Sequence, residues 1–410
     1  MTKPTATYTI WKEHNLLKKT GIGAVAILCT LAAQALWGAG TTTPLKRRRT
    51  SSPHNAHRYR HASRRRTTAS LRRVRHRRRL SRWSPWSVSS FSDSAIGDSP
   101  LGEDPVVRAA ALEALGNWNG SVVVVDPNTG RILSIVNQKL ALSGAFTPCS
   151  TFKPVVALAA LKECIVSPET KLRVWGRGGP RLNLTDALAH SNNMYFAKLG
   201  EMLGFRRVSA YAREFGLGER AGWNILGESP GFFPPAPPKE GGVGLLTSFG
   251  QDIELTPLQL AAIASAIANG GTLYYLQYPR APEEIAQFEP MVRRHLDGFE
   301  RFIPQVKQGM AAAVLYGTAR SAFDAEDPIF GKTGTCSENG ARLGWFASFG
   351  GETQTQPKYV VVVLLRGGKM MFGPHAAEIA GKLYRDLHDR EKLAIERRPF
   401  APAVASGAQR

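Results

Sequence analysis

The stretch Thr147–Glu163 reads TPCSTFKPVVALAALKE and decides how the rest of the chain is interpreted. Its apolar run after Pro154 predicts a helix, because proline is tolerated in a first helical turn. Residues three apart share a helical face, so Lys153 is expected beside Ser150. A serine hydroxyl becomes a good nucleophile only when a neighbouring base accepts its proton. The spacing therefore fits a nucleophile with its base, or a helix cap followed by a surface lysine.

Two further short elements favour the catalytic interpretation. Ser191 and Asn193 stand in the run SNN, and Lys332–Thr335 reads KTGT. Ser-x-x-Lys, Ser-x-Asn and Lys-Thr-Gly in this chain order form a known set in serine acyl-transfer enzymes. A lysine acts as the base in such a site only if burial or a nearby cation lowers its pKa. We therefore interpret Ser150 as a candidate nucleophile and Lys153 as its candidate base.

Patterns at both ends of the main segment predict strands, with helices between them. Gly120–Val136 holds two β-rich runs joined by Asp-Pro-Asn-Thr-Gly, which is a hairpin signal. Arg342–Gly351 and Lys358–Gly368 predict two more strands. Leu255–Gly271 and Ala376–Asp389 predict helices. The sequence thus predicts an α+β fold, with an antiparallel β-sheet and helices packed on its faces.

Residues 118–387 resemble the transpeptidase domain of class B penicillin-binding proteins. The likeness rests on the three motifs and on the runs VVVVDPNTGRILSIV and SFGQDIELTPLQLAAIASAIANGGT. This family belongs to the serine penicillin-recognising acyl-transferase superfamily. The resemblance implies a peptidoglycan D,D-transpeptidase that forms a Ser150 acyl-enzyme from a D-Ala-D-Ala stem peptide and is inhibited by β-lactams. It implies no metal and no organic cofactor.

The resemblance also implies a catalytic role for each matching residue. Lys153 would activate Ser150, and Ser191 would pass the proton toward the leaving amine. Asn193 would hold Lys153 and the substrate amide. Lys332 would keep the site electropositive and help protonation. These five residues are the implied catalytic set.

The rest of the Lys-Thr-Gly-Thr element is implied to bind substrate. The hydroxyls of Thr333 and Thr335 would bond the terminal carboxylate. Gly334 would let the edge strand approach the substrate backbone closely. The backbone N–H groups of Ser150 and Thr335 would form the oxyanion hole.

Two alternative enzymes share parts of this pattern. Class D β-lactamases also carry Ser-Thr-Phe-Lys, but they favour an apolar residue where this chain has Asn193. A D,D-carboxypeptidase uses water in place of the acceptor amine, and the sequence does not separate it from a transpeptidase.

The net charge of +21 is concentrated near the N-terminus. Residues 46–82 hold 16 Lys or Arg and no Asp or Glu, whereas 33 basic and 31 acidic residues follow position 82. Such a segment cannot bury a core, so disorder is expected. We expect it to act as a solvated linker, and the alternative is electrostatic contact with anionic lipid, wall polymers or nucleic acid. Nucleic acid is disfavoured as a partner because the main domain carries almost none of this excess charge.

Gly21–Gly40 carries no charge and has the length of a membrane-spanning helix. A cleaved signal peptide is the alternative, with Ala33-Gln34-Ala35 as its cleavage site. The basic segment that follows favours a cytoplasmic main domain under the positive-inside rule. A transpeptidase must nevertheless act where stem peptides are presented, outside the cytoplasmic membrane. We therefore expect a single-pass protein of the inner (cytoplasmic) membrane with an extracytoplasmic catalytic domain.

These observations divide the chain into five parts. They are a cytoplasmic N-terminus at 1–20, the transmembrane anchor at 21–40, an Arg-rich disordered linker at 41–104, the transpeptidase domain at 105–395 and a flexible tail at 396–410.

The four cysteines show neither metal-ligand spacing nor the density of a disulfide scaffold. The resembled family usually has glycine before the nucleophile, where this chain has Cys149. Cys336 directly follows the KTGT element. If the two oxyanion N–H groups are adjacent in space, these two cysteines are neighbours as well. We hypothesise that they form a redox-sensitive pair.

Overall fold

A computed structural model describes residues 86–176, 178–351 and 357–396 of the chain. The predicted anchor at 21–40 and the basic segment at 46–82 lie outside the described residues. Within the described ranges, no helix has both the length and the apolar character needed to cross a membrane.

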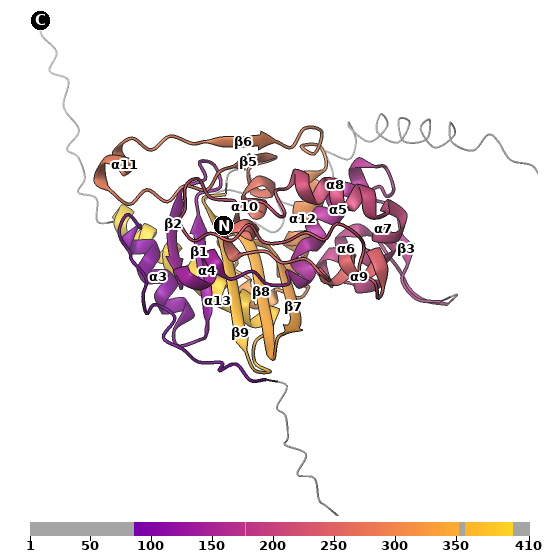
Figure 1. The fold of residues 1–410 in the computed structure, drawn as a ribbon, viewed down its shortest axis with the longest axis horizontal. Helices are drawn as coiled ribbons and strands as arrows, with labels where there is room; N and C mark the ends of the chain where they lie inside the picture. Colours follow the sequence, from indigo (N-terminus) through magenta and orange to yellow (C-terminus); the bar gives the residue numbers. More distant parts are fainter. Residues whose placement is uncertain (1–85, 177, 352–356, 397–410) are drawn as a thin grey trace, which may run out of the picture. The chain divides into compact units, whose positions relative to one another are not determined.

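A five-stranded sheet forms the centre of the fold, and every neighbouring pair in it is antiparallel. Its order is β2-β1-β9-β8-β7, which leaves β7 at one edge (Figure 1). The strands are β1 Gly120–Val125, β2 Ile132–Val136, β7 Phe330–Glu338, β8 Ala341–Gly350 and β9 Tyr359–Gly367. The predicted antiparallel sheet and its predicted strands are therefore confirmed.

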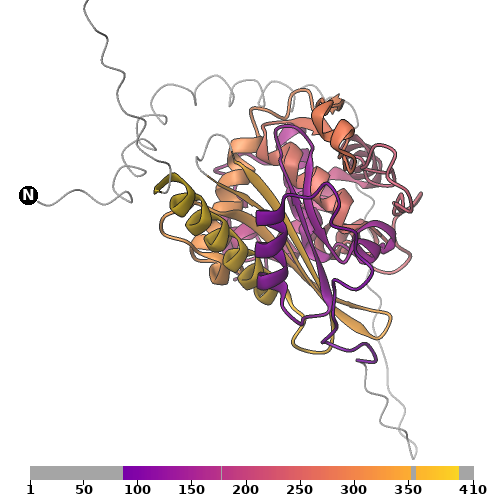
Figure 2. The ribbon, with the colours of Figure 1, turned by 90° about the vertical axis from the view of Figure 1, so that its left-hand side faces the viewer.

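The sheet is covered on both faces. Along β9, Val360, Val362 and Leu364 enter one apolar core, while Val361, Val363 and Leu365 enter the other. Helices α3 Pro105–Leu115 and α13 Gly373–Glu396 pack on one face, where Figure 2 shows them together. Helix α10 Pro257–Ala268 packs on the opposite face. Burial on both faces explains why these strands read as unbroken apolar runs and do not alternate.

A group of helices lies beside the β7 edge of the sheet (Figure 1). Helix α5 Lys153–Lys162 is buried along Lys153–Leu161 and contacts α7, α8 and α12. A helix that is apolar all round belongs inside a core, so α5 is a central helix without a solvent-facing side. The group comprises α5, α6 Leu184–Ala189, α7 Asn193–Leu203, α8 Phe205–Glu214, α9 Gly242–Phe249 and α12 Ile303–Leu315.

Several short elements complete the described fold. They are α4 Gln138–Ser143, α11 Pro282–Ala286, the 3-10 turns η1 Cys149–Phe152 and η2 Arg320–Ala322, and the two-stranded pairs β3 Leu172–Arg173 with β4 Arg181–Leu182 and β5 Thr272–Tyr274 with β6 Val292–His295.

Residues 86–104 pack against the domain, which corrects the linker boundary expected at 104. Asp98 and Glu103 accept hydrogen bonds from the buried Arg108 guanidinium, at 2.9 and 3.2 Å. Phe91 stacks on Trp118 with ring centroids 4.8 Å apart. The sequence of this segment is rich in Ser, Gly and Asp, which favours loop, but its carboxylates neutralise a buried cation. The folded domain therefore begins before residue 105.

Candidate active site

The nucleophile candidate lies in a tight turn that runs directly into the buried helix. Ser150 belongs to η1, and the backbone N–H of Lys153 donates to its carbonyl oxygen. Neither η1 nor α5 has a side-chain N-cap, and Lys153 is 0% exposed. Ser150 is therefore not a helix cap, and Lys153 is not a surface lysine. Pro154 occupies the first turn of α5, as predicted.

The Lys153 amine is held by the Ser-x-Asn element. Its Nζ donates to the Ser191 carbonyl oxygen at 2.7 Å and to the Asn193 Oδ1 at 2.6 Å, and it lies 3.1 Å from the Ser191 Oγ. Ser191 sits in the turn between α6 and α7 with a φ of 52°, and Asn193 begins α7. The fold thus brings Lys153 to Ser191 and Asn193, which lie 38 and 40 positions further along the chain.

The electrostatic surroundings disfavour a charged Lys153. Burial lowers the pKa of Lys153 well below its usual value, and the nearby Lys332 charge lowers it further. Burial also lowers the pKa of Lys332, to about 7. Removing an ammonium from water penalises its charged form, and a second cation adds to that penalty. Both effects favour the neutral amine of Lys153, which is the form that a proton acceptor requires.

The Lys-Thr-Gly-Thr element forms part of edge strand β7. The Nζ of the fully buried Lys332 donates to the Thr333 carbonyl oxygen at 2.9 Å. The Thr333 hydroxyl lies 2.6 Å from the hydroxyl of Thr318. The Thr335 Oγ1 accepts from the Gly373 N–H at 2.8 Å. Both hydroxyls therefore have fixed positions along the strand edge.

Gly334 allows β7 to lie directly against the nucleophile turn. A Cβ at this position would lie 3.0 Å from the Pro148 carbonyl oxygen and 3.1 Å from the Thr151 Cγ2. Those separations are tighter than ordinary van der Waals contact, so a side chain here would push strand and turn apart. Gly334 is therefore required because β7 packs closely on the turn that carries Ser150. The role implied from the family concerned only the approach of the substrate.

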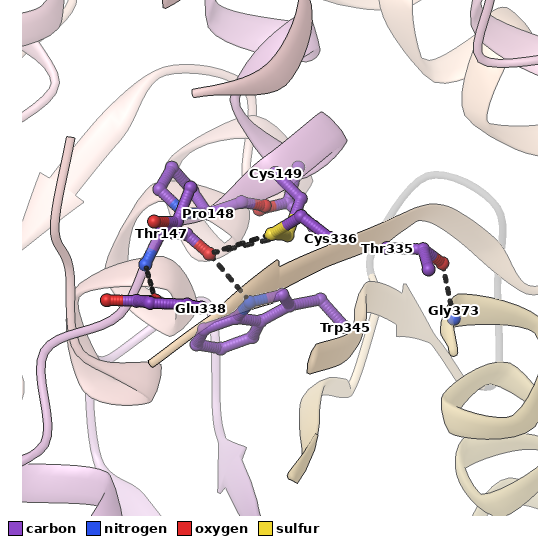
Figure 3. Close-up of a disulfide and its surroundings, with 9 residues drawn as sticks. Thr147, Pro148, Cys149, Thr335, Cys336, Glu338, Trp345 and Gly373 are labelled. Carbon is purple, nitrogen blue, oxygen red and sulfur yellow. Dashed lines mark hydrogen bonds between the residues drawn. A yellow bond between two sulfur atoms is a disulfide. The ribbon is translucent and has the colours of Figure 1, made fainter. Parts of the chain in front are cut away.

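Cys149 and Cys336 form a disulfide with Cα atoms 5.7 Å apart (Figure 3). It joins the residue before the candidate nucleophile to the residue after Thr335. The hypothesis that these two cysteines are neighbours is therefore confirmed, while their redox sensitivity stays a prediction.

Sequence reasoning missed several residues that hold these parts in place. Thr318 bonds Thr333, and the backbone N–H of Gly373 bonds Thr335. Gly250 packs on the nucleophile turn, where a Cβ would lie 2.7 Å from the Pro148 Cγ. Thr318 lies in the segment between α12 and η2, and Gly373 is the first residue of α13, where it contributes only its backbone N–H. No spacing rule could find either residue. Gly250 stands in the run SFGQD, which the family resemblance covered without assigning it a role.

The nucleophile candidate, a buried lysine with a lowered pKa and a lysine-bearing edge strand that contacts the Ser150 turn are the parts that acyl transfer to a serine uses. Residues 120–385 match the family described as the penicillin binding protein transpeptidase domain. The chain therefore belongs to this family, and the class B resemblance is confirmed.

Curated relatives and a solved structure agree with this assignment. The chain is 29% identical over 282 residues to stage V sporulation protein D of Bacillus subtilis, covering 62% of this chain and 44% of that protein. It is 27% identical over 306 residues to peptidoglycan D,D-transpeptidase FtsI of Escherichia coli, covering 65% and 50%. A crystal structure of Pseudomonas aeruginosa PBP2 has a similar fold, with a TM-score of 0.59 and 24% identity over 71% of this chain and 78% of that one. The chain spans about half the length of the curated relatives it matches.

Proposed function

We propose that the protein is a peptidoglycan D,D-transpeptidase that cross-links stem peptides through an acyl-enzyme on Ser150. Family membership and the names of relatives such as FtsI support this activity. The observation that carries the proposal is the environment of Lys153. This amine is buried, has a lowered pKa and is oriented by Ser191 and Asn193.

In the acylation step, the Ser150 Oγ attacks the carbonyl carbon of the penultimate D-Ala. Lys153 accepts the hydroxyl proton as the new C–O bond forms. The C–N bond to the last D-Ala then breaks, and the leaving amine takes a proton by way of the Ser191 hydroxyl, which lies 3.1 Å from the Lys153 Nζ. The backbone N–H groups of Ser150 and Thr335 stabilise the tetrahedral oxyanion.

The substrate carboxylate is assigned to the Lys-Thr-Gly-Thr edge. A terminal carboxylate is bound well by hydroxyl donors in an electropositive setting. Thr333 and Thr335 supply the hydroxyls, and Lys332 supplies the positive potential when it is protonated. Gly334 keeps the strand close to the nucleophile turn.

The acyl-enzyme is resolved by an amine of a second stem peptide, which forms the cross-link and frees Ser150. Attack by water in place of the amine would give a D,D-carboxypeptidase. A class D β-lactamase is disfavoured because Asn193, a polar residue, bonds the base at a position where that class favours an apolar one.

Residues outside the described ranges complete the proposal. We place the protein in the inner membrane through residues 21–40, with the domain outside the cytoplasm. The basic segment 46–82 would contact anionic lipid or wall polymers near that membrane.

A time course with a fluorescent penicillin tests the proposed activity. The purified protein is expected to acquire a persistent label, and a Ser150→Ala variant of equal thermal stability none. Rapid loss of label with drug hydrolysis would indicate a β-lactamase. Incubation with a D-Ala-D-Ala pentapeptide and a second peptide amine then measures cross-linked product against hydrolysed product, which separates transpeptidase from carboxypeptidase.

A further inference from the structure

The turn that carries Ser150 is attached to the sheet mainly through the residues just before it. The Thr147 N–H donates to the Glu338 carboxylate on β7 at 3.0 Å. The Thr147 carbonyl oxygen accepts from the Trp345 Nε1 on β8 at 3.0 Å (Figure 3). Both sulfurs of the disulfide lie near that same oxygen, at 3.5 and 3.9 Å. The Cys149–Cys336 bond is the covalent member of this set of attachments.

Cys149 has a backbone conformation that a side chain disfavours. Its φ is 53°, in the left-handed region that glycine adopts freely. The residue is 1% exposed, and Gly250 packs so closely on it that an added Cβ there would lie 3.1 Å from the Cys149 carbonyl oxygen. A non-glycine residue persists in this region only when its surroundings hold it there. The bond to Cys336 is a covalent contact of Cys149 in these surroundings.

We propose that the Cys149–Cys336 disulfide is a positioning device for the reaction, which makes acylation of Ser150 fast in the oxidised protein and slow in the reduced one. The proposal rests on the proposed function of Ser150. The peptide that joins Cys149 to Ser150 carries the N–H assigned to the oxyanion hole, and β7 carries the second N–H at Thr335. A bond between Cys149 and Cys336 therefore fixes the separation of the two donors.

Reduction requires a dithiol reagent and releases both cysteines. A thiolate of the dithiol attacks the Cys336 sulfur, because Cys336 is partly exposed while Cys149 is buried. The protein S–S bond breaks, and Cys149 leaves as a thiolate. The second thiol of the reagent then displaces Cys336 and closes a cyclic disulfide. The protein gains two electrons and two protons, and the reagent loses them. Cys149 is then free to relax to a negative φ, which turns the Ser150 N–H away from its position.

The first measurement compares labelling rates of the oxidised and reduced protein. The full chain with Cys29→Ser and Cys164→Ser leaves this pair as its only cysteines. Its acylation by fluorescent penicillin is followed before and after treatment with dithiothreitol, and after reoxidation. We expect reduction to slow acylation by about 10- to 100-fold, reversibly, because small displacements of reacting groups cost that much.

Two variants separate positioning from simple loss of stability. Cys336→Ser removes the cross-link and leaves Cys149 unsupported, so slow acylation is expected with or without reductant. Combining Cys336→Ser with Cys149→Gly supplies a residue that adopts positive φ without a cross-link. This double variant is expected to recover most of the acylation rate, and the reductant is expected not to change that rate. Both variants lack the disulfide and are expected to melt at a lower temperature than the parent.

The outcomes distinguish this proposal from the proposed function. Equal labelling of the oxidised and reduced protein overturns the positioning role alone. Failure of the added glycine to restore the rate also overturns it, and assigns the disulfide to stability. Absence of label in every protein, including the oxidised parent, overturns both the positioning role and the proposed function.

Discussion

At the scale of single residues, the candidate site contains two buried lysines, one of which influences the protonation of the other. Lys153 and Lys332 are both 0% exposed, and the charge of Lys332 adds to the burial that lowers the pKa of Lys153. Ion pairs usually compensate buried ammonium groups, whereas these two amines have neutral oxygen partners. The arrangement favours the neutral form of Lys153 at the expense of folding free energy, as expected of a functional site.

Acylation should therefore depend on pH through Lys153. We expect the second-order acylation rate to rise with pH, since only the neutral amine accepts the Ser150 proton. Lys332→Met removes a cation that lowers the pKa of Lys153, so the rising limb of the pH profile should shift to higher pH. Labelling rates measured between about pH 5.5 and 9, in steps of about half a pH unit, give the rising limb of the parent protein and that of Lys332→Met.

A matched lysine provides the control for this shift. Lys307 is also largely buried with a lowered pKa, but its Nζ bonds the Ala268 carbonyl oxygen in another part of the core. Lys307→Met should leave the midpoint of the profile unchanged. A midpoint that also stays in place in Lys332→Met would show that Lys332 does not act on Lys153 through its charge.

Asn193→Ala tests the orientation of the base. It deletes the Oδ1 that accepts from the Lys153 Nζ at 2.6 Å. Loss of a hydrogen bond to a group that becomes charged costs about 1.5–3 kcal/mol, so acylation should fall by roughly 10- to 100-fold.

The neighbouring Asn192 separates this effect from helix stability. Its side chain caps α7 by accepting from the Tyr195 N–H at 2.9 Å. Asn192→Ala should lower the free energy of unfolding by about 1 kcal/mol with little effect on acylation. Similar labelling rates in the two alanine variants would contradict an orienting role for Asn193.

At the scale of elements, the sequence predicted those strands and helices whose apolar residues follow the pattern that burial in the core requires. The strands at 120–136, 342–351 and 358–368 were found because their apolar residues fill cores on both faces of the sheet. Strand β7 was recognised only through its motif, since FGKTGTCSE has no apolar alternation. An edge strand beside a polar site does not need that alternation, so periodicity could not reveal it.

Gly334→Ala tests the close approach of β7 to the nucleophile turn. The added methyl group would meet the Pro148 carbonyl oxygen at 3.0 Å and must displace the strand or the turn. A displacement of about 1 Å between reacting groups can slow a reaction by roughly 100-fold. We therefore expect acylation to fall by about that factor while the protein stays folded. Ser337→Ala, an exposed position on the same strand, is the control and should label at the parental rate. Parental labelling of Gly334→Ala would show that the spacing is not needed.

At the scale of the whole molecule, the three motifs pointed to the candidate site because each is a short local pattern. Their meeting point and supports depended on tertiary structure. The bond between Lys153 and Ser191 joins residues 38 positions apart, and the one between Thr335 and Gly373 joins residues 38 apart as well. No local pattern encodes such pairs. The domain start at 105 was placed too late for the same reason, since Asp98 also accepts hydrogen bonds from the N–H groups of Asn137 and Gln138, which are 39 and 40 positions away.

The buried cluster around Arg108 predicts where the folded domain can be cut. Arg108 pairs with Asp98 and Glu103, whose side chains are 3% and 1% exposed. A fragment of residues 105–396 lacks both carboxylates and leaves the guanidinium without its charge partners. Breaking a buried pair in this way typically costs about 3–5 kcal/mol, so this fragment should unfold at lower denaturant than residues 86–396.

Replacing Arg108 identifies the cause of that loss. Arg108→Met in the 105–396 fragment removes the unpaired charge, so part of the lost stability should return. The same replacement in the 86–396 fragment leaves Asp98 and Glu103 buried without their cation and should destabilise it. Opposite effects of one substitution in the two fragments would assign the stability of residues 86–104 to this charge cluster. Equal unfolding midpoints of the two parent fragments would instead show that residues 86–104 do not stabilise the domain, and that the stable domain begins at residue 105.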